Sequence, residues 1–247
     1  MTTAPIPTSA APEPTGAMGR IIGAFFSPKQ TFASIVIRPT WIVPVILNCC
    51  FFIAIVGVFT QRGGWPSFFE KQNANNSRIQ QMSAEDREKV ISSQLKYAPP
   101  FGYVEGVFLP PLVTLAVAGV LLGAFTLVGA KTNFRTSRGI VAYAWVPWLI
   151  QGLLSILILF LRDPSTVDLQ NLVASNPGAF LADDAPKWLA AFLSTIDLFT
   201  IWTIALLAMG FSATNPKKIS FGKAFGTVFG VWFIYVIVKV GITVVFS

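Results

Sequence analysis

The sequence contains no histidine, only two cysteines and few charged residues, which make up 12% of its 247 positions. Histidine is the commonest general base and metal ligand, so its absence removes the usual centre of hydrolytic and metal chemistry. The H-E-x-x-H, G-x-S-x-G and G-x-x-x-x-G-K-[ST] motifs are also missing. Cys49 and Cys50 are adjacent, which suits neither a zinc site nor an ordinary disulfide, and we interpret them as apolar filler instead of redox or lipidation sites. We therefore predict no catalytic residue, no metal, no cofactor and no enzymatic activity.

Apolar residues are abundant and occur in long runs. They make up 53% of the chain, aromatic residues make up 13%, and the mean hydropathy is +0.64. Runs of about 20 residues cross a bilayer as helices, whereas the strands of a membrane barrel need only about 10 alternating residues. We predict an all-α polytopic membrane protein, a bundle of five transmembrane helices. The expected spans are Ile42 to Phe59, Leu109 to Val128, Ile140 to Leu161, Leu189 to Phe211 and Ala224 to Phe246.

The residues before the first span divide into two parts. Residues 1–17 are rich in Pro, Thr, Ala and Ser, which predicts a disordered tail. Residues 18–40 contain two short apolar pieces, and we expect an interfacial amphipathic segment with Arg20 and Lys29 among the lipid phosphates. Packing of this segment against the bundle is the alternative. Residues 41–247 would then form the five-helix membrane domain.

A polar loop is expected over residues 60–108, between the first two spans. Within it Ser83 is placed as the N-cap of a short helix, and Glu85 and Lys89 have the i,i+4 spacing of an ion pair. The loop between the third and fourth spans contains Asn176-Pro177-Gly178, a typical turn sequence.

The formal net charge is +7, but the basic residues are spread over the loops and form no single basic face. We therefore predict no nucleic-acid partner and use the charges to infer topology. Loops 129–139 and 212–223 contain basic residues and no acidic ones, whereas loop 162–188 is acidic and loop 60–108 carries both signs. By the positive-inside rule the N-terminus is cytoplasmic and the C-terminus lies outside, in the cytoplasmic (inner) membrane if the source is bacterial.

Two charged residues interrupt the predicted spans. Asp197 in the fourth span and Lys239 in the fifth lie at similar distances from the outer end, so we expect them to pair. The pair would either fix the register of the two helices or belong to a proton or ion relay, with Gln151 and Tyr143 as polar neighbours. Lys239 could instead extend to the interface.

Glycines recur at four-residue spacing in two places, and such faces let helix backbones approach closely. We predict helix contacts there, within one chain or between chains. The residues are Gly119 and Gly123 in the second span and Gly222, Gly226 and Gly230 at the start of the fifth.

Three segments in a fixed order resemble a known family. They are FSPKQTF from Phe26 to Phe32, AYAWVP from Ala142 to Pro147, and IDLFTIW from Ile196 to Trp202, followed by MGF from Met209 to Phe211. The chain resembles the Yip family, in its bacterial branch, from about Met18 to the C-terminus. The resemblance implies five membrane helices and a cytosolic N-terminus. It also relates the chain to eukaryotic members that bind Ypt/Rab GTPases in vesicle traffic between endoplasmic reticulum and Golgi.

Two details of the family pattern concern function. Tyr143 and Pro147 match a pattern in the third span of eukaryotic members, which usually have glycine at the position of Ala142. The eukaryotic Asp-Leu-Tyr-Gly-Pro segment is reduced here to Ser27-Pro28, without the acidic residue, which argues against binding of a Rab-type GTPase. Physically, Pro147 would free a carbonyl one turn earlier and kink the span.

Two classes of function fit these observations. The first is a membrane organising or protein-interaction component, whose partners are the lipid bilayer and either a second copy or another membrane protein. The second is a small-solute or ion permease that uses Asp197 and Lys239. An intramembrane enzyme would need a second carboxylate in the spans, which the sequence lacks. A water-filled cavity that reaches Asp197 would favour the permease, and a closed bundle would favour the organising protein.

Overall fold

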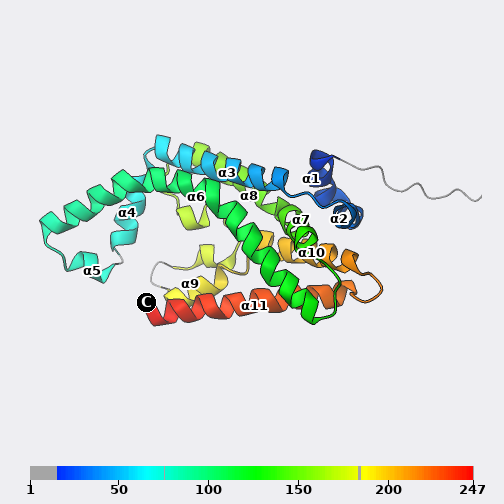
Figure 1. Cartoon of the computed structure of the whole chain (residues 1–247). Coiled ribbons are helices and arrows are strands. Elements are labelled where there is room, and N and C mark those ends of the chain that lie inside the picture. The colour runs from blue at the N-terminus through cyan, green and yellow to red at the C-terminus, as the bar shows by residue number, and fades with distance from the viewer. Residues whose placement is uncertain (1–15, 75, 183–184, 247) are drawn as a thin grey trace, which may run out of the picture.

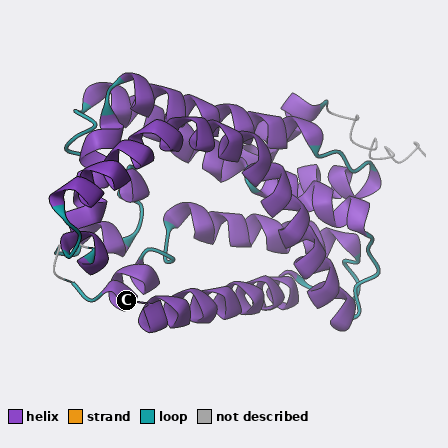
Figure 2. Cartoon of the chain, turned by 60° about the vertical axis from the view of Figure 1, so that its left-hand side comes forward, coloured by secondary structure: helices purple, strands orange, loops and turns teal. Residues whose placement is uncertain are grey.

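The computed structural model describes residues 16–74, 76–182 and 185–246; residues 1–15 of the predicted tail lie outside this range. All regular secondary structure in the described residues is helical (Figures 1 and 2), so the all-α prediction is confirmed. The α-helices are α1 (Ala17–Phe26), α2 (Pro28–Ile37), α3 (Ile42–Gln61), α4 (Gly64–Ala74), α5 (Ser77–Gln80), α6 (Ala84–Leu127), α7 (Phe134–Ala144), α8 (Val146–Leu161), α9 (Lys187–Leu193), α10 (Leu198–Thr214) and α11 (Phe221–Phe246). Two short 3₁₀ helices, η1 (Leu169–Asn171) and η2 (Pro177–Phe180), lie between α8 and α9.

Four helical segments of the described chain are long and apolar enough to cross a membrane: α3, α6, the joined α7 and α8, and α11. A fifth span results if α9 and α10, which meet at an angle of 46°, are taken together. These helices agree with the predicted polytopic bundle. The fourth span, predicted as one continuous helix, is instead broken between Leu193 and Leu198.

The expected polar loop 60–108 is helical over most of its length, which corrects the prediction. It contains α4, α5 and the first half of α6, which has 44 residues and is therefore roughly 66 Å long. Two proline pairs, at 99–100 and 110–111, lie inside α6 without ending it. Each proline removes only one helical hydrogen bond and clashes locally, which bends a helix without breaking it when packing supports both sides. Figure 1 shows α6 changing direction along its course.

Close packing against α3 supports the middle of α6. A Cβ atom on Gly106 would come within 3.0 Å of side-chain atoms of Ile53 and Phe52, and one on Gly102 within 3.1 Å of Val56. The small-residue contact of α6 therefore uses the pair Gly102 and Gly106. The pair predicted from the sequence, Gly119 and Gly123, lies further along α6.

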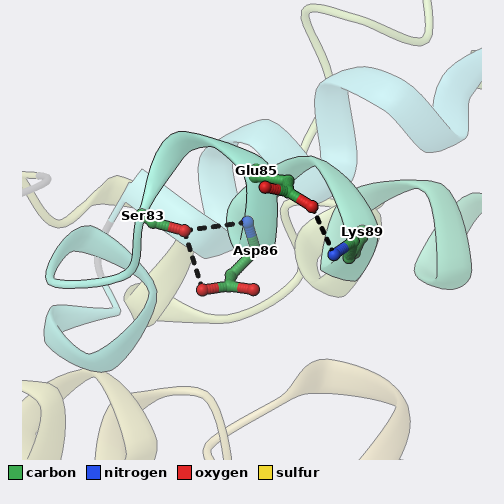
Figure 3. A network of polar contacts seen from close by, with 4 residues as sticks. All are labelled: Ser83, Glu85, Asp86 and Lys89. Carbon is green, nitrogen blue, oxygen red and sulfur yellow. Dashed lines mark hydrogen bonds and ion pairs between the residues drawn. The ribbon is translucent and has the colours of Figure 1, made fainter.

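The start of α6 confirms two predictions (Figure 3). The Ser83 hydroxyl accepts a hydrogen bond from the backbone N–H of Asp86 at 3.1 Å, as an N-cap does. One turn later Lys89 Nζ lies 2.6 Å from Glu85 Oε1. Both of these charged side chains are exposed, so the pair contributes little to stability. The predicted turn at Asn176 is also present, because its side chain caps η2 by accepting from the Ala179 N–H at 3.1 Å.

The N-terminal helices pack on the bundle. Phe32 and Ile35 of α2 are fully buried, and α2 contacts α10 and α7. The core beneath them includes Phe125 and Phe211, whose rings stack with centroids 4.1 Å apart. The outer side of this segment is apolar and exposed, and Phe26 is 83% accessible. Packing, the alternative that the sequence left open, therefore accounts for the inner face of α1 and α2.

Candidate functional site

The junction between the N-terminal helices and the third span contains a polar network of two buried side chains, Arg20 and Tyr143, and the exposed Thr40. Thr40, in the connection between α2 and α3, has its hydroxyl 3.0 Å from the hydroxyl of Tyr143 on α7. Arg20 of α1 donates from Nη1 to the same Thr40 oxygen at 3.0 Å and to the Arg38 carbonyl at 2.7 Å. Tyr143 is fully buried and Arg20 is 5% exposed. Helices α1 and α7 and the connection between α2 and α3 are thus joined through one threonine.

The same connection packs tightly on α7. The Arg138 guanidinium lies 4.3 Å from the centroid of the Trp41 ring, a cation–π distance. A Cβ on Gly139 would meet the Thr40 carbonyl oxygen at 3.1 Å, so the absence of a side chain there permits the close approach. The junction therefore holds α1 and α2 in a fixed place against the first and third spans.

Arg20 corrects an expectation, because it does not lie among lipid phosphates. Its hydrogen-bond acceptors are the Thr40 hydroxyl and the backbone carbonyls of Arg38 and, at 3.5 Å, Ser34. No carboxylate is among them in the described residues. Carbonyl oxygens that lack partners at the end of a helix satisfy an arginine well, and this arrangement stabilises the end of α2. Local sequence spacing carries no signal for these partners, which lie 14 to 20 positions away.

The third span is interrupted close to Pro147. Helix α7 ends at Ala144, Trp145 is a turn residue, and α8 begins at Val146. Pro147 lies in the first turn of α8, where a missing N–H costs nothing. The irregularity that the proline predicted is therefore located at Trp145, two residues earlier.

Asp197 caps a helix and is not a charge in the middle of one. It precedes α10, and its Oδ1 accepts from the backbone N–H groups of Phe199 at 2.8 Å and Thr200 at 3.1 Å. Its Oδ2 accepts a short hydrogen bond from the Ser175 hydroxyl, and the Leu198 N–H donates to the Ser175 carbonyl at 3.1 Å. Asp197 thus begins α10 and fastens the helix to the segment before η2.

The predicted direct pairing of Asp197 with Lys239 is not formed. Lys239 Nζ instead donates to the hydroxyl of Ser194 at 3.1 Å. Ser194 ends α9, so Lys239 contacts one side of the break in the fourth span while Asp197 caps the other. The physical reason is that the carboxylate is already used by two N–H donors and a hydroxyl group.

The other polar candidates lie elsewhere. Gln151 lines a cavity between α3 and α8 together with Asn48, and neither Asp197 nor Lys239 is among the lining residues. Tyr143 belongs to the junction with Thr40. The four residues proposed for a relay are therefore distributed over three separate places and form no continuous polar path among the described residues.

The predicted glycine stripes face open space. A Cβ atom added at any of the five would meet no atom of the chain within 4 Å; these residues are Gly119, Gly123, Gly222, Gly226 and Gly230. They therefore make no close helix contact within the chain. The four-residue glycine pattern does not mark the positions where helices do approach closely. These include Gly210, which faces Ile140 and Phe32, and Gly152, which faces Phe51.

Taken together, the fold and the junction define a class: a helical, multi-pass membrane protein whose N-terminal helices dock on the bundle. Residues 22–242 match the Yip1 domain. The match covers most of the chain, and the protein belongs to the Yip1 domain family. Among curated proteins and among solved structures no match to the chain is found.

Proposed function

We propose that this Yip1-domain protein organises the membrane by binding other membrane helices, of a second copy or of another protein, and catalyses no reaction. The observation that carries the proposal is the outward face of α11. Gly222 and Gly226 on this face are exposed, and a Cβ atom added at either would meet no neighbouring atom within 4 Å. A partner helix could therefore approach them closely. Only 11% of the apolar stretch of α11 is buried within the chain.

A row of aromatic side chains runs beside the glycines on α11. The rings of Phe225, Phe229 and Phe233 follow one another at four-residue spacing, with centroids 6.2 Å and 6.3 Å apart. Stacking holds these large side chains in one orientation, which lowers the entropy lost when a partner packs on them. A flat glycine surface beside a fixed aromatic ridge is suited to contact with another helix.

The permease alternative receives less support. Transport of a polar solute requires connected polar groups along a path through the bilayer. Asp197 is hydrogen-bonded by Ser175 and Lys239 by Ser194, and neither charged residue lines the cavity that contains Gln151.

The orientation of the chain in the membrane and its branch of the family are proposed from the sequence. The N-terminus is proposed to be cytoplasmic and the C-terminus outside, and the chain is proposed to belong to the bacterial branch of the family. A Rab-type GTPase is not proposed as a partner, because Ser27 is the single residue between α1 and α2, Pro28 begins α2, and the pair brings no acidic residue.

Crosslinking in native membranes tests the contact face. Gly226→Cys would be introduced into a chain that carries Cys49→Ser and Cys50→Ser, and oxidised without detergent. The exposed control is Tyr235→Cys, nine residues further on and about half a turn around the helix, and the buried control is Ala224→Cys. We expect disulfide-linked dimers at position 226 and not at the controls.

A photoreactive phenylalanine analogue at Phe229 extends the test to other proteins. We expect it to capture a second copy or one reproducible membrane protein that the same probe at Tyr235 does not capture. If position 226 forms no dimer and the probe at 229 captures only lipid, the proposal is wrong.

A further inference from the structure

A cavity of about 370 Å³ lies between α3, α8 and the segment that contains η1. Its walls are mainly aromatic and aliphatic, and none of the described lining residues carries a charge. A volume in this range, with apolar walls and a few polar groups, is typical of sites for small ligands. The residues that matter for the argument are Asn48, Phe51, Phe59, Trp65, Trp148 and Gln151.

The cavity follows the length of two spans that run in the same direction. Gly152 of α8 lies against Phe51 of α3, and Arg62 at the end of α3 donates to the Leu159 and Phe160 carbonyls at the end of α8, at 2.7 Å and 2.6 Å. The lining residues Asn48 and Phe59 are 11 positions apart on α3, which corresponds to roughly 16 Å along the helix. The cavity is thus elongated along the spans.

Two of the lining side chains, Phe59 and Trp65, are held in place by contacts near the end of α3. The Trp65 Nε1–H donates to the Thr60 hydroxyl at 2.9 Å, and the Trp65 and Phe59 rings meet edge to face with centroids 5.1 Å apart. The segment that contains η1 is joined to α4, because Lys71 Nζ donates to the Ser165 carbonyl at 2.9 Å. Polar groups at this end are therefore already satisfied, and the space between them suits hydrocarbon.

Gln151 is one of three polar side chains in the lining, with Asn48 and Ser155. Its Oε1 atom is buried and has no hydrogen-bond partner within the described residues. A buried amide oxygen without a donor is unfavourable, because it has lost its hydrogen bonds to water and gained none in the protein. Gln151 is a lining residue, and rotation of its terminal amide, whose last torsion is broad, would turn this oxygen toward the cavity, where a ligand O–H group would satisfy it. A carboxylate or phosphate would find no cation in the lining.

We propose that this cavity binds the hydrocarbon chain of an uncharged lipid with a hydroxyl group, such as an acylglycerol or a long-chain alcohol. The hydroxyl donates to Gln151 Oε1, and the chain extends along α3 and α8 toward Phe59 and Trp65. Both helices are candidate membrane spans, so the cavity lies at the depth where such lipids are dissolved. This binding site is independent of the contact face on α11.

The test uses the full-length chain in phosphatidylcholine vesicles and a monoacylglycerol that carries a photoreactive diazirine in its chain. After irradiation, mass spectrometry locates the labelled peptides. We expect saturable labelling of peptides containing residues 48–59 and 148–155. Unlabelled monoacylglycerol should compete, and the fatty-acid methyl ester, which has the chain but no donor, should compete roughly five- to tenfold less well, as expected for one hydrogen bond.

Two variants separate the hydrogen bond from the space. Gln151→Leu removes the unpaired oxygen and should remain folded in thermal unfolding, yet it should bind the hydroxyl lipid no better than the methyl ester. Ile55→Trp, at a lining residue, should fill the cavity and abolish labelling of both peptides. Thr227→Val on α11 is the control and should label as the wild type does.

Two results would overturn the proposal. One is labelling that does not saturate and falls equally on the exposed peptides of α11, which is the pattern of lipid at the outer surface. The other is equal competition by alcohol and methyl ester in both the wild type and Gln151→Leu. Neither result bears on dimer formation at position 226, so this proposal and the proposed function fail separately.

Discussion

The hydroxyl groups of Thr40 and Tyr143 lie 3.0 Å apart although the two residues are 103 positions apart in the chain. Arg20 donates to the same threonine oxygen, so α1, the connection to α3, and α7 meet at one atom. The contact joins the N-terminal helices to a tyrosine of the segment that resembles the Yip family pattern. This tyrosine therefore has a structural partner that does not depend on any GTPase.

Replacing Tyr143 by phenylalanine should destabilise the protein without disordering it. The change removes one buried hydroxyl, that of Tyr143, and leaves the Arg20 contact to Thr40 in place, so the expected loss is roughly 0.5–1.5 kcal/mol. Arg20→Met should cost more, because it leaves the Arg38 carbonyl and the Thr40 hydroxyl without their donor. Unfolding in detergent, followed by loss of helical circular dichroism, measures both changes.

Tyr235→Phe is the matched control for the tyrosine change. Tyr235 is 56% exposed on α11, and removal of its hydroxyl should leave the unfolding curve unchanged. If the two tyrosine variants unfold alike, the hydrogen bond to Thr40 contributes nothing to stability.

Gly210→Ala should destabilise the bundle where α10 packs. A Cβ at this position would collide with the Ile140 side chain and approach Phe32 Cδ1 to 3.0 Å, and both neighbours are fully buried. Crowding of a packed core typically costs about 1–3 kcal/mol, more than the gain of roughly 1 kcal/mol in helix propensity. Unfolding curves of the single variants measure the difference.

The control is the same exchange at Gly230, where the added methyl group meets no atom of the chain within 4 Å. Gly230→Ala should be neutral or slightly stabilising in the isolated chain. Equal destabilisation by both changes would contradict the assignment of Gly210 as a close contact.

The spans were largely predictable because hydropathy is a property of local sequence. The break in the fourth span was harder to predict. In the sequence, an aspartate within an apolar run looks the same whether it lies in the middle of a helix or caps the start of one. A signal did exist: Asp197 directly precedes an apolar helical run, which is the position that N-cap residues prefer.

Tertiary contacts explain the remaining differences. Proline usually ends or kinks a helix, but α6 continues through both of its proline pairs, with α3 packed closely at Gly102 and Gly106. The partners of Tyr143 and Arg20 come from other segments, and local spacing carries no information on them. Which glycines lie in contacts likewise depends on how whole helices face one another.

Asp197 offers a test that separates a cap from an ion pair. Asp197→Asn keeps an oxygen that can accept from the Phe199 and Thr200 N–H groups, and should unfold close to the wild type. Asp197→Ala removes the cap and should cost about 0.5–2 kcal/mol. If the asparagine variant were as unstable as the alanine variant, the charge itself would be essential and a role as a cap alone would be excluded.

The start of α6 provides the last prediction. Ser83→Ala removes the oxygen that accepts from the Asp86 N–H, and the expected cost is about 1 kcal/mol for the first turn of the helix. Lys89→Ala breaks an exposed ion pair only 2.6 Å long, yet its cost should stay below about 0.5 kcal/mol because water screens both charges. Amide hydrogen exchange over residues 84–90 should therefore accelerate clearly in Ser83→Ala and hardly in Lys89→Ala. The reverse order would mean that the ion pair, and not the cap, holds the helix start.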